Sequence, residues 1–170
     1  SIIAIGRAPI VKISRTIPPT PVAAPWYGSI NEGWLCDSIL KAQAEAAGLP
    51  IQLINSSWQD YETNFVQALT SLKQQYALTD AVFGDIDLQA HRDWEEKVCN
   101  KAGLNAFLPL WLQNRRTLVI QMLAAGIETM IVSCNSIMGP SFLGKTLTIE
   151  LIDQLEAMGI DACGENGEFH

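Results

Sequence analysis

Small and acidic residues collect at four places where short apolar runs of the sequence end. The runs cover residues 51–54, 81–83, 129–132 and the segment ending at Cys163. The residues that follow them are Ser56, Gly84, Asp85, Asn135, Gly164, Glu165, Gly167 and Glu168. A carboxylate such as Asp85 could hold a metal-bound nucleotide or a substrate ammonium group, and a glycine lets a ligand approach the backbone. The pair Glu165 and Glu168, around a glycine turn, could bind a cation or act as acid and base.

Each of these residues also has a structural explanation. Polar residues are common at strand ends, where the chain enters solvent or caps a helix, and an acidic turn can simply be solvated. Their expected convergence favours a site, because ligands of open parallel sheets bind beyond the carboxyl ends of the strands. Arg92, about two turns into the following helix, could contact a substrate or pair with an acidic neighbour.

Residues 139–146 match the phosphate-loop pattern G-x-x-x-x-G-K-[ST], with Lys145 as its lysine. Such a loop should follow a buried strand directly, whereas residues 133–137 intervene here, and bulky Phe142 and Leu143 replace small residues. The context therefore argues against a phosphate loop.

The segments that would position these residues alternate between two patterns. Helical periodicity covers residues 35–47, 58–76, 88–102, 114–125 and 146–158, and a glycine follows each of four of these segments. The apolar runs between the helices read as buried strands. Residues 1–5 could form another strand, whereas the prolines that follow predict an extended loop up to residue 33. The sequence therefore predicts an α/β fold with a mostly parallel sheet flanked by helices.

Composition narrows the class of partner. The net charge is −7 and no basic stripe is present, so nucleic acid is not an expected partner. Four scattered cysteines and two histidines do not form a metal-binding pattern, and we expect reduced thiols and no protein-held metal. Without a membrane-length apolar run or a secretory signal, a soluble cytoplasmic protein is expected. Composition predicts no oligomeric state.

Four segments resemble one family. They are Val-Phe-Gly-Asp-Ile at 82–86, Pro-Leu-Trp at 109–111, Leu-Gly-Lys at 143–145 and, most specifically, Asp-Ala-Cys-Gly-Glu-Asn-Gly-Glu-Phe-His at 161–170. Through these four segments the sequence, from about residue 31 onward, resembles the diphthine–ammonia ligase family of N-type ATP pyrophosphatases. The resemblance is to the bacterial branch of that family, which is adenine nucleotide alpha-hydrolase-like. The resemblance implies a nucleotide-binding-like part at 1–100 and a smaller substrate-binding part at 101–170.

The resemblance also implies a reaction and its partners. ATP with Mg²⁺ would activate a small-molecule carboxylate as an adenylate, ammonia would form the amide, and AMP and pyrophosphate would leave. By position, Gly84 and Asp85 fall in the motif at the nucleotide and substrate cleft, with Ser56 on the nucleotide side. Asp85, Glu165 and Glu168 are then the expected catalytic residues. The expected substrate contacts are Arg92, Asn135, Gly164, Glu165, Gly167 and Glu168.

Two family features are absent from the 170 residues. The phosphate-gripping Ser-Gly-Gly-Lys-Asp-Ser segment does not occur, and neither does a histidine-glycine pair near residues 31–33. The family also continues beyond the position of His170, so we expect a chain shortened at both ends. Because these two features are missing, two other functions stay open. One is a binding module without catalysis, and the less favoured one is a phosphate-loop hydrolase that uses Lys145. The acyl substrate is not predicted.

Overall fold

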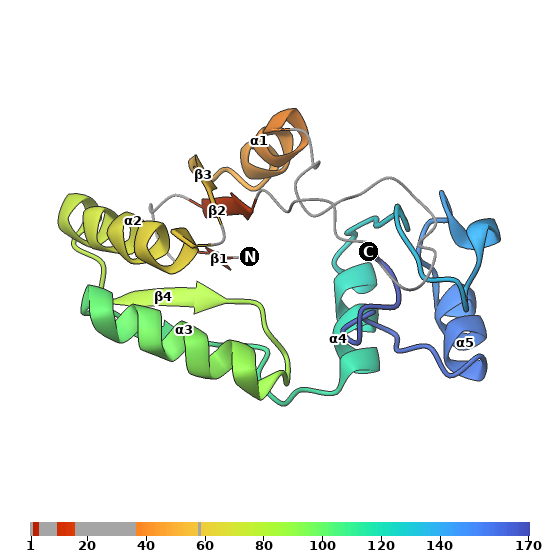
Figure 1. The fold of residues 1–170 in the computed structure, drawn as a ribbon. Coiled ribbons are helices and arrows are strands. Elements are labelled where there is room, and N and C mark those ends of the chain that lie inside the picture. The colour runs from red at the N-terminus through yellow and green to blue at the C-terminus, as the bar shows by residue number, and fades with distance from the viewer. Residues whose placement is uncertain (1, 4–9, 16–36, 58) are drawn as a thin grey trace. The chain divides into compact units, whose positions relative to one another are not determined.

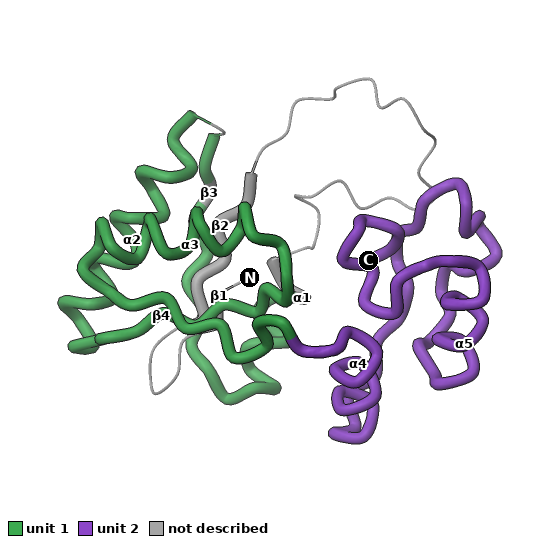
Figure 2. Tube along the Cα trace, turned by 90° about the horizontal axis from the view of Figure 1, so that it is seen from below, with its two compact units in different colours: residues 1–18, 31–112 green, residues 19–30, 113–170 purple. Residues whose placement is uncertain are grey.

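The computed structural model describes residues 2–3, 10–15, 37–57 and 59–170, and the chain divides into two compact units. Of the described residues, unit 1 contains those up to Leu112, and unit 2 contains Gln113–His170 (Figure 2). The division expected after residue 100 falls inside a helix, and the observed one comes after Leu112. What each part binds stays a prediction.

Unit 1 contains two small groups of strands. Strands β1 (Ile2–Ile3), β4 (Asp80–Phe83) and β5 (Asn105–Phe107) form one sheet in the order β1-β4-β5. Strands β2 (Ile10–Arg15) and β3 (Ile51–Ser56) pair in parallel over six residues. Strands β4 and β5 are also parallel, while β1 runs antiparallel to β4. The α/β class with parallel strand pairs is confirmed.

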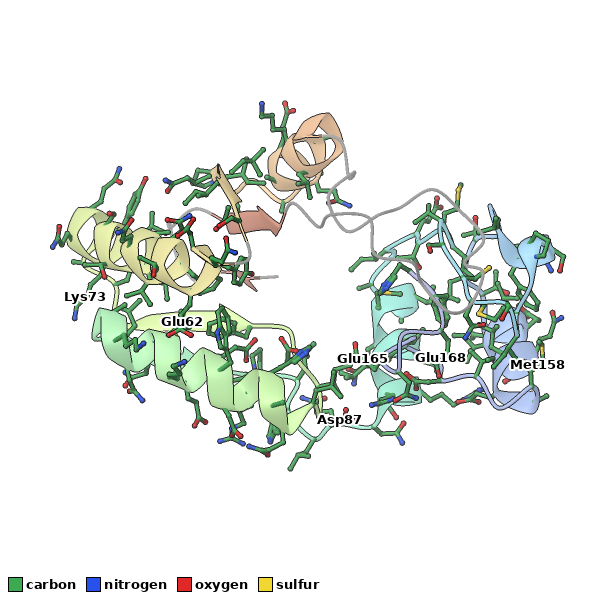
Figure 3. All side chains as sticks on the ribbon, viewed as in Figure 1. Glu62, Lys73, Asp87, Met158, Glu165 and Glu168 are labelled. Atoms are coloured by element: carbon green, nitrogen blue, oxygen red, sulfur yellow. The ribbon has the colours of Figure 1, made fainter. Side chains whose placement is uncertain are left out.

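Three helices accompany these strands in unit 1: α1 (Asp37–Ala46), α2 (Tyr61–Tyr76) and α3 (Gln89–Ala102). Helix α2 buries Phe65, Ala68, Leu69 and Leu72, whose three- and four-residue spacing forms one apolar face. This face packs with α3 and the buried residues of β4 in the core of unit 1 (Figure 1). Glu62 of α2, labelled in Figure 3, forms ion pairs with Lys97 and Lys101 of α3, at 2.7 and 2.6 Å.

Unit 2 is built from α4 (Arg115–Ala124), the short 3₁₀ helix η1 (Pro140–Phe142) and α5 (Ile149–Ala157). The side chains of Asn114 and Thr148 accept hydrogen bonds from backbone N–H groups of the first turns of α4 and α5, which fixes where these helices begin. The unit has its own core, in which Ile152 and Leu155 of α5 are fully buried.

All five helices lie within the predicted segments, and Gly48, Gly103, Gly126 and Gly159 have the expected left-handed conformation. Helix α2 begins at Tyr61, after a turn that is closed by hydrogen bonds between Ser57 and Asp60. The Ser57 hydroxyl accepts from the Asp60 N–H at 3.1 Å and donates to Asp60 Oδ2 at 2.6 Å.

The strand predictions were less accurate. Residues 129–132 are not a strand: Met130 makes an isolated bridge to Thr146, and only Ile131 of the run is buried. The segment 161–163 is a turn. Conversely, β2 lies where an extended loop was expected, and β5 was not predicted. A short apolar run shows that a segment is buried, but it does not provide the neighbouring chain that a ladder of hydrogen bonds requires.

In the described part of the chain, no helix has the length and apolar character needed to cross a membrane.

Candidate functional site

The carboxyl end of β4 places Gly84 and Asp85 next to the core of unit 1. Ala81, Val82 and Phe83 are buried, so the strand fixes the point at which the chain leaves the sheet. The loop that follows is held by a hydrogen bond of 2.7 Å from the Leu112 N–H to the Ile86 carbonyl. Asp85 thus stands on an anchored loop.

Asp85 is held by two side chains of α3. His91 Nδ1 lies 2.7 Å from Asp85 Oδ1, and the two side chains are 59% and 18% exposed. Glu95, one turn beyond His91, also forms a side-chain hydrogen bond with Asp85. Glu95 is only 5% exposed, and its Oε2 has no hydrogen-bond partner among the described residues. The three residues form a chain that runs from the core to the solvent.

The two carboxyl groups differ in protonation. Burial and then the hydrogen bond and negative charge of Asp85 raise the pKa of Glu95 from 4.5 to about 9. Burial alone would raise the pKa of Asp85, but hydrogen bonds from Glu95 and His91 outweigh it and lower that pKa below its ordinary value. At neutral pH, Asp85 is therefore the anion of the pair and Glu95 carries a proton.

Gly84 leaves open space beside this anion. Its φ is not positive, and a Cβ built there would meet no atom within 4 Å. Folding therefore does not require glycine at this position, and the backbone is accessible to a ligand.

The remaining residues predicted for unit 1 already have partners within the protein. The Ser56 hydroxyl, at the end of β3, donates to the Ser57 carbonyl and accepts from Asn64 Nδ2 at 2.9 Å. Arg92 Nε donates to Glu96 Oε1 at 2.7 Å, and its guanidinium lies 5.0 Å from the centre of the Trp111 ring. Residues 82–86 and 109–111, two of the segments that carry the family resemblance, thus lie close together. Trp111 contacts Arg92, and the next residue, Leu112, donates to the Ile86 carbonyl.

In unit 2, the structure brings Asn135 and Glu168 together. The Asn135 N–H donates to the Glu168 carbonyl at 2.8 Å, and Cys134 and Phe169 form an isolated bridge. The Asn135 side chain caps the following turn by accepting from the N–H groups of Ile137 and Met138, both at 3.1 Å. The Asn135 amide oxygen therefore has a structural role.

The turn at 161–168 is organised by Asp161. Its Oδ2 accepts from the Glu165 N–H at 2.8 Å and lies 3.0 Å from a guanidinium nitrogen of Arg115. Glu168 Oε1 accepts from Asn166 Nδ2 at 3.1 Å, while its Oε2 is buried without a described partner. Figure 3 shows Glu165 and Glu168 on this C-terminal segment. The turn brings carboxylates and a guanidinium together.

Glycine is required at position 164 in this turn. Gly164 has φ +68°, and an added Cβ would lie 2.7 Å from the Phe169 carbonyl oxygen. Gly167 also has a positive φ, of +78°, but space is open around it.

Residues 139–146 do not have the form of a phosphate loop. They contain η1 and do not join a strand to a helix, since α5 begins only at Ile149. The Lys145 ammonium lies over the Phe142 ring, 4.6 Å from its centre, instead of standing at a helix N-terminus.

Ser56, Gly84 and Asp85 do lie at the ends of strands, in two different sheets, and their role in a site stays a prediction. The strands predicted before Asn135, Glu165 and Glu168 are not present among the described residues. Asp85 lies in unit 1 and Glu165 in unit 2, so their expected convergence stays a prediction. His91, Glu95, Arg115 and Asp161 were not predicted. Glu95 could have been found, because it is an acidic residue at the helical spacing of the buried residues Val98, Cys99 and Ala102.

A hollow of about 480 Å³ lies elsewhere in unit 1, lined by Ala77, Leu78, Thr79, Asp80 and Phe107. It opens at the amino end of β4, where Thr79 and Asn105 already hydrogen-bond the Asp80 carboxylate. The carboxyl end, with the anionic Asp85 and open Gly84, is the stronger candidate.

Among the described residues, no group of three or more His, Cys, Asp or Glu side chains is arranged to hold a metal ion. The Asp85 carboxylate offers oxygen atoms that accept hydrogen bonds. It therefore suits the hydroxyl and amino groups of a nucleotide, or an ammonium ion. Cationic groups for the phosphates would have to come from elsewhere, because Arg92 is paired with Glu96.

One family model matches part of the chain. Residues 34–106 match the family model of the diphthamide synthase N-terminal domain, and no curated protein matches the chain. The matched segment contains β3, β4 and α3, and with them Ser56, Gly84, Asp85 and Arg92. The match is consistent with the diphthine–ammonia ligase family of N-type ATP pyrophosphatases. The α/β structure, which has parallel strands, is consistent with an adenine nucleotide alpha-hydrolase-like fold. The matched segment is less than half of the 170 residues.

Proposed function

We propose that this chain, similar to diphthamide synthase over residues 34–106, is ligase-like and joins a carboxylate to ammonia at the expense of ATP. ATP would supply the AMP group that activates the carboxylate, with Mg²⁺ accompanying its phosphates and pyrophosphate leaving. The nitrogen of ammonia would then bond to the acyl carbon as the bond to AMP breaks, and the nitrogen would lose a proton. The observation that carries the proposal is the position of Asp85, which follows the carboxyl end of β4, contacts His91 and lies inside the matched segment.

Asp85 has the properties that this site needs. Its negative charge persists at neutral pH, and its carboxylate can accept hydrogen bonds from ammonium or from the hydroxyl and amino groups of a nucleotide. Gly84 leaves room for the ligand, and Ser56 ends strand β3, which belongs to the other pair of strands in the same unit. We assign these three residues to the nucleotide side, with Asp85 also catalytic.

The substrate side is assigned to Arg92, with its guanidinium beside Trp111, and to the C-terminal turn of unit 2. In that turn Gly164 and Gly167 shape the backbone, and Asn135 is bonded to Glu168. Glu165 and Glu168 supply the carboxyl groups for proton transfer, and the buried Oε2 of Glu168 supports this role.

Pyrophosphate release tests the proposal. The protein would be incubated with ATP, Mg²⁺, ammonium and a panel of carboxylates, each reagent being omitted in turn. We expect release that depends on both ATP and a carboxylate, and an Asp85→Asn variant at least tenfold slower. Asp93→Asn removes an exposed carboxylate from α3 and should match the unchanged protein.

A second function, binding of a nucleotide or carboxylate without catalysis, is favoured by the pairing of Arg92 with Glu96, which directs this guanidinium to a carboxylate of its own helix. Nucleotide binding that is lost in Asp85→Asn, together with no pyrophosphate release on any carboxylate, would establish this alternative over the ligase.

A further inference from the structure

Glu95 is an acidic residue in a core position. It lies on the face of α3 that also presents Val98, Cys99 and Ala102, all buried in the core of unit 1. An ionised carboxylate in such surroundings is strongly unfavourable unless a cation or several donors compensate it. The charged side chain of Arg92, three residues earlier, is directed to Glu96 instead.

The groups that face Glu95 account for its protonation. From the loop after β4 it meets the Asp85 carboxyl, and from its own helix the negative charge of Glu96 acts on it. The Cys99 thiol, one turn further along, is fully buried, and burial followed by the charge of Glu95 raises the pKa of this thiol to about 12. Burial, the Asp85 carboxyl and the charge of Glu96 thus disfavour a negative charge on Glu95.

A hydrogen bond between two carboxyl groups requires a proton on one of them, since a carboxylate can only accept. Glu95 is the more buried partner and keeps the proton, while Asp85 remains the anion. Asp85 therefore accepts from Glu95 on its core side. It accepts from His91 Nδ1, at 2.7 Å, on its solvent side.

We propose that Glu95 is a positioning residue, whose protonated carboxyl holds Asp85 from the core while His91 holds it from the solvent, so that Asp85 is fixed in place for its ligand. That Asp85 binds a ligand rests on the proposed function. The hydrogen bonds that join Glu95, Asp85 and His91 do not depend on it. When Glu95 ionises at alkaline pH, it stops donating, and two neighbouring carboxylates repel each other. The site should then lose its arrangement.

The chain offers a matched set of variants. Glu95→Gln keeps the shape and donates an N–H to Asp85 without titrating, whereas Glu95→Leu keeps a similar volume without any donor. Asp93→Asn removes an exposed carboxylate of the same helix and is the control.

Carboxyl ¹³C chemical shifts followed as a function of pH test the positioning directly. We expect Glu95 to remain protonated through neutral pH and to titrate near 9. Asp85 should titrate below its ordinary range in the unchanged protein, in Glu95→Gln and in Asp93→Asn. In Glu95→Leu, its titration should move to higher pH. Titration of Glu95 near 4.5 in the folded protein would overturn the proposal, and this result does not depend on the Leu variant folding.

Affinity for ATP with Mg²⁺, measured by calorimetry from pH 7 to 10, adds the functional readout. Binding to the unchanged protein and to Asp93→Asn should weaken about tenfold as pH rises through 9, whereas binding to Glu95→Gln should not follow that decline. Equal pH dependence in all three would overturn the positioning role. Absence of binding at every pH would count against the proposed function alone, because the ¹³C titration decides the positioning role separately.

Discussion

At the scale of single residues, the protonation of one carboxyl group decides what the site can do. Asp85 and Glu95 share a hydrogen bond, but their environments differ, so Asp85 is charged and Glu95 is neutral at pH 7. Asp85 was predicted from its place after an apolar run. Its partners were not, because His91 and Glu95 come six and ten residues later and only the helix turns them back toward it.

The pH dependence of stability follows from the raised pKa of Glu95. The folded protein keeps a proton on Glu95 up to about pH 9, whereas the unfolded chain releases it above about 4.5. The stabilising contribution of this group is therefore complete below pH 4.5 and is lost as pH rises to 9. Asp85 acts in the opposite direction, and its contribution is lost as pH falls below 3.8.

Urea unfolding between pH 5 and 9 measures this effect. The free energy of unfolding of the unchanged protein should fall relative to that of Glu95→Gln as pH rises, and Asp93→Asn should follow the unchanged protein. Parallel curves for the unchanged protein and Glu95→Gln would contradict a protonated Glu95.

Substitutions of Lys145 and Asp85 distinguish the proposed site from a phosphate loop. Lys145→Ala should change the affinity for ATP by less than about twofold, because its ammonium lies over Phe142 rather than at a helix N-terminus. Asp85→Ala should weaken binding about 10- to 100-fold, as expected for loss of hydrogen bonds to a charged group. Equilibrium binding of a fluorescent ATP analogue provides the measurement, and the reverse order of effects would favour the phosphate loop.

At the scale of elements, helices were predictable from this sequence and strands were less so. A helix contains its own hydrogen bonds, and the spacing of Phe65, Leu69 and Leu72 was enough to identify α2. A strand needs a partner that its own sequence does not specify. The run 129–132 therefore resembled a strand without being one, and β2 formed in a stretch where the nearby prolines suggested a loop.

The turn that carries Glu165 and Glu168 depends on glycine in a way that two substitutions can separate. Gly164→Ala adds a Cβ only 2.7 Å from the Phe169 carbonyl at φ +68°, whereas Gly167→Ala meets no atom within 4 Å. The φ preference alone costs about 1 kcal/mol, and we expect about that loss of stability for Gly167→Ala and at least about 2 kcal/mol more for Gly164→Ala. Thermal unfolding followed by circular dichroism measures both variants, and equal losses would be inconsistent with the close contact.

At the scale of the whole molecule, the chain has two units, each with a core of its own. The α/β class and the five helices of the described residues were predicted, and Asp85, Glu165 and Glu168 were named as candidate site residues. The convergence of those motifs could not be derived, because the argument required strands before Asn135 and Glu165 that the structure does not contain. The family match ends at residue 106, within unit 1, so it covers Asp85 but not Glu165 or Glu168.

The two cores lead to a prediction about local stability. Phe83 and Leu155 are both fully buried, the first in unit 1 and the second in unit 2. The free energy of unfolding should fall by about 3–5 kcal/mol in Phe83→Ala and by about 2–5 kcal/mol in Leu155→Ala. Hydrogen exchange followed by mass spectrometry should show lost protection in α2 and α3 for Phe83→Ala, and in α4 and α5 for Leu155→Ala. Equal loss across both units would show that they unfold as one.

The most direct test of the proposed chemistry is the identity of the nucleotide product. The full chain would be incubated with α-³²P-labelled ATP, Mg²⁺, ammonium and the carboxylate panel, and the labelled products would be separated by chromatography. The account predicts AMP, formed only when a carboxylate is present and reduced at least tenfold in Asp85→Asn but not in Asp93→Asn. Labelled ADP as the product, or AMP formation that is unaffected by Asp85→Asn, would contradict it.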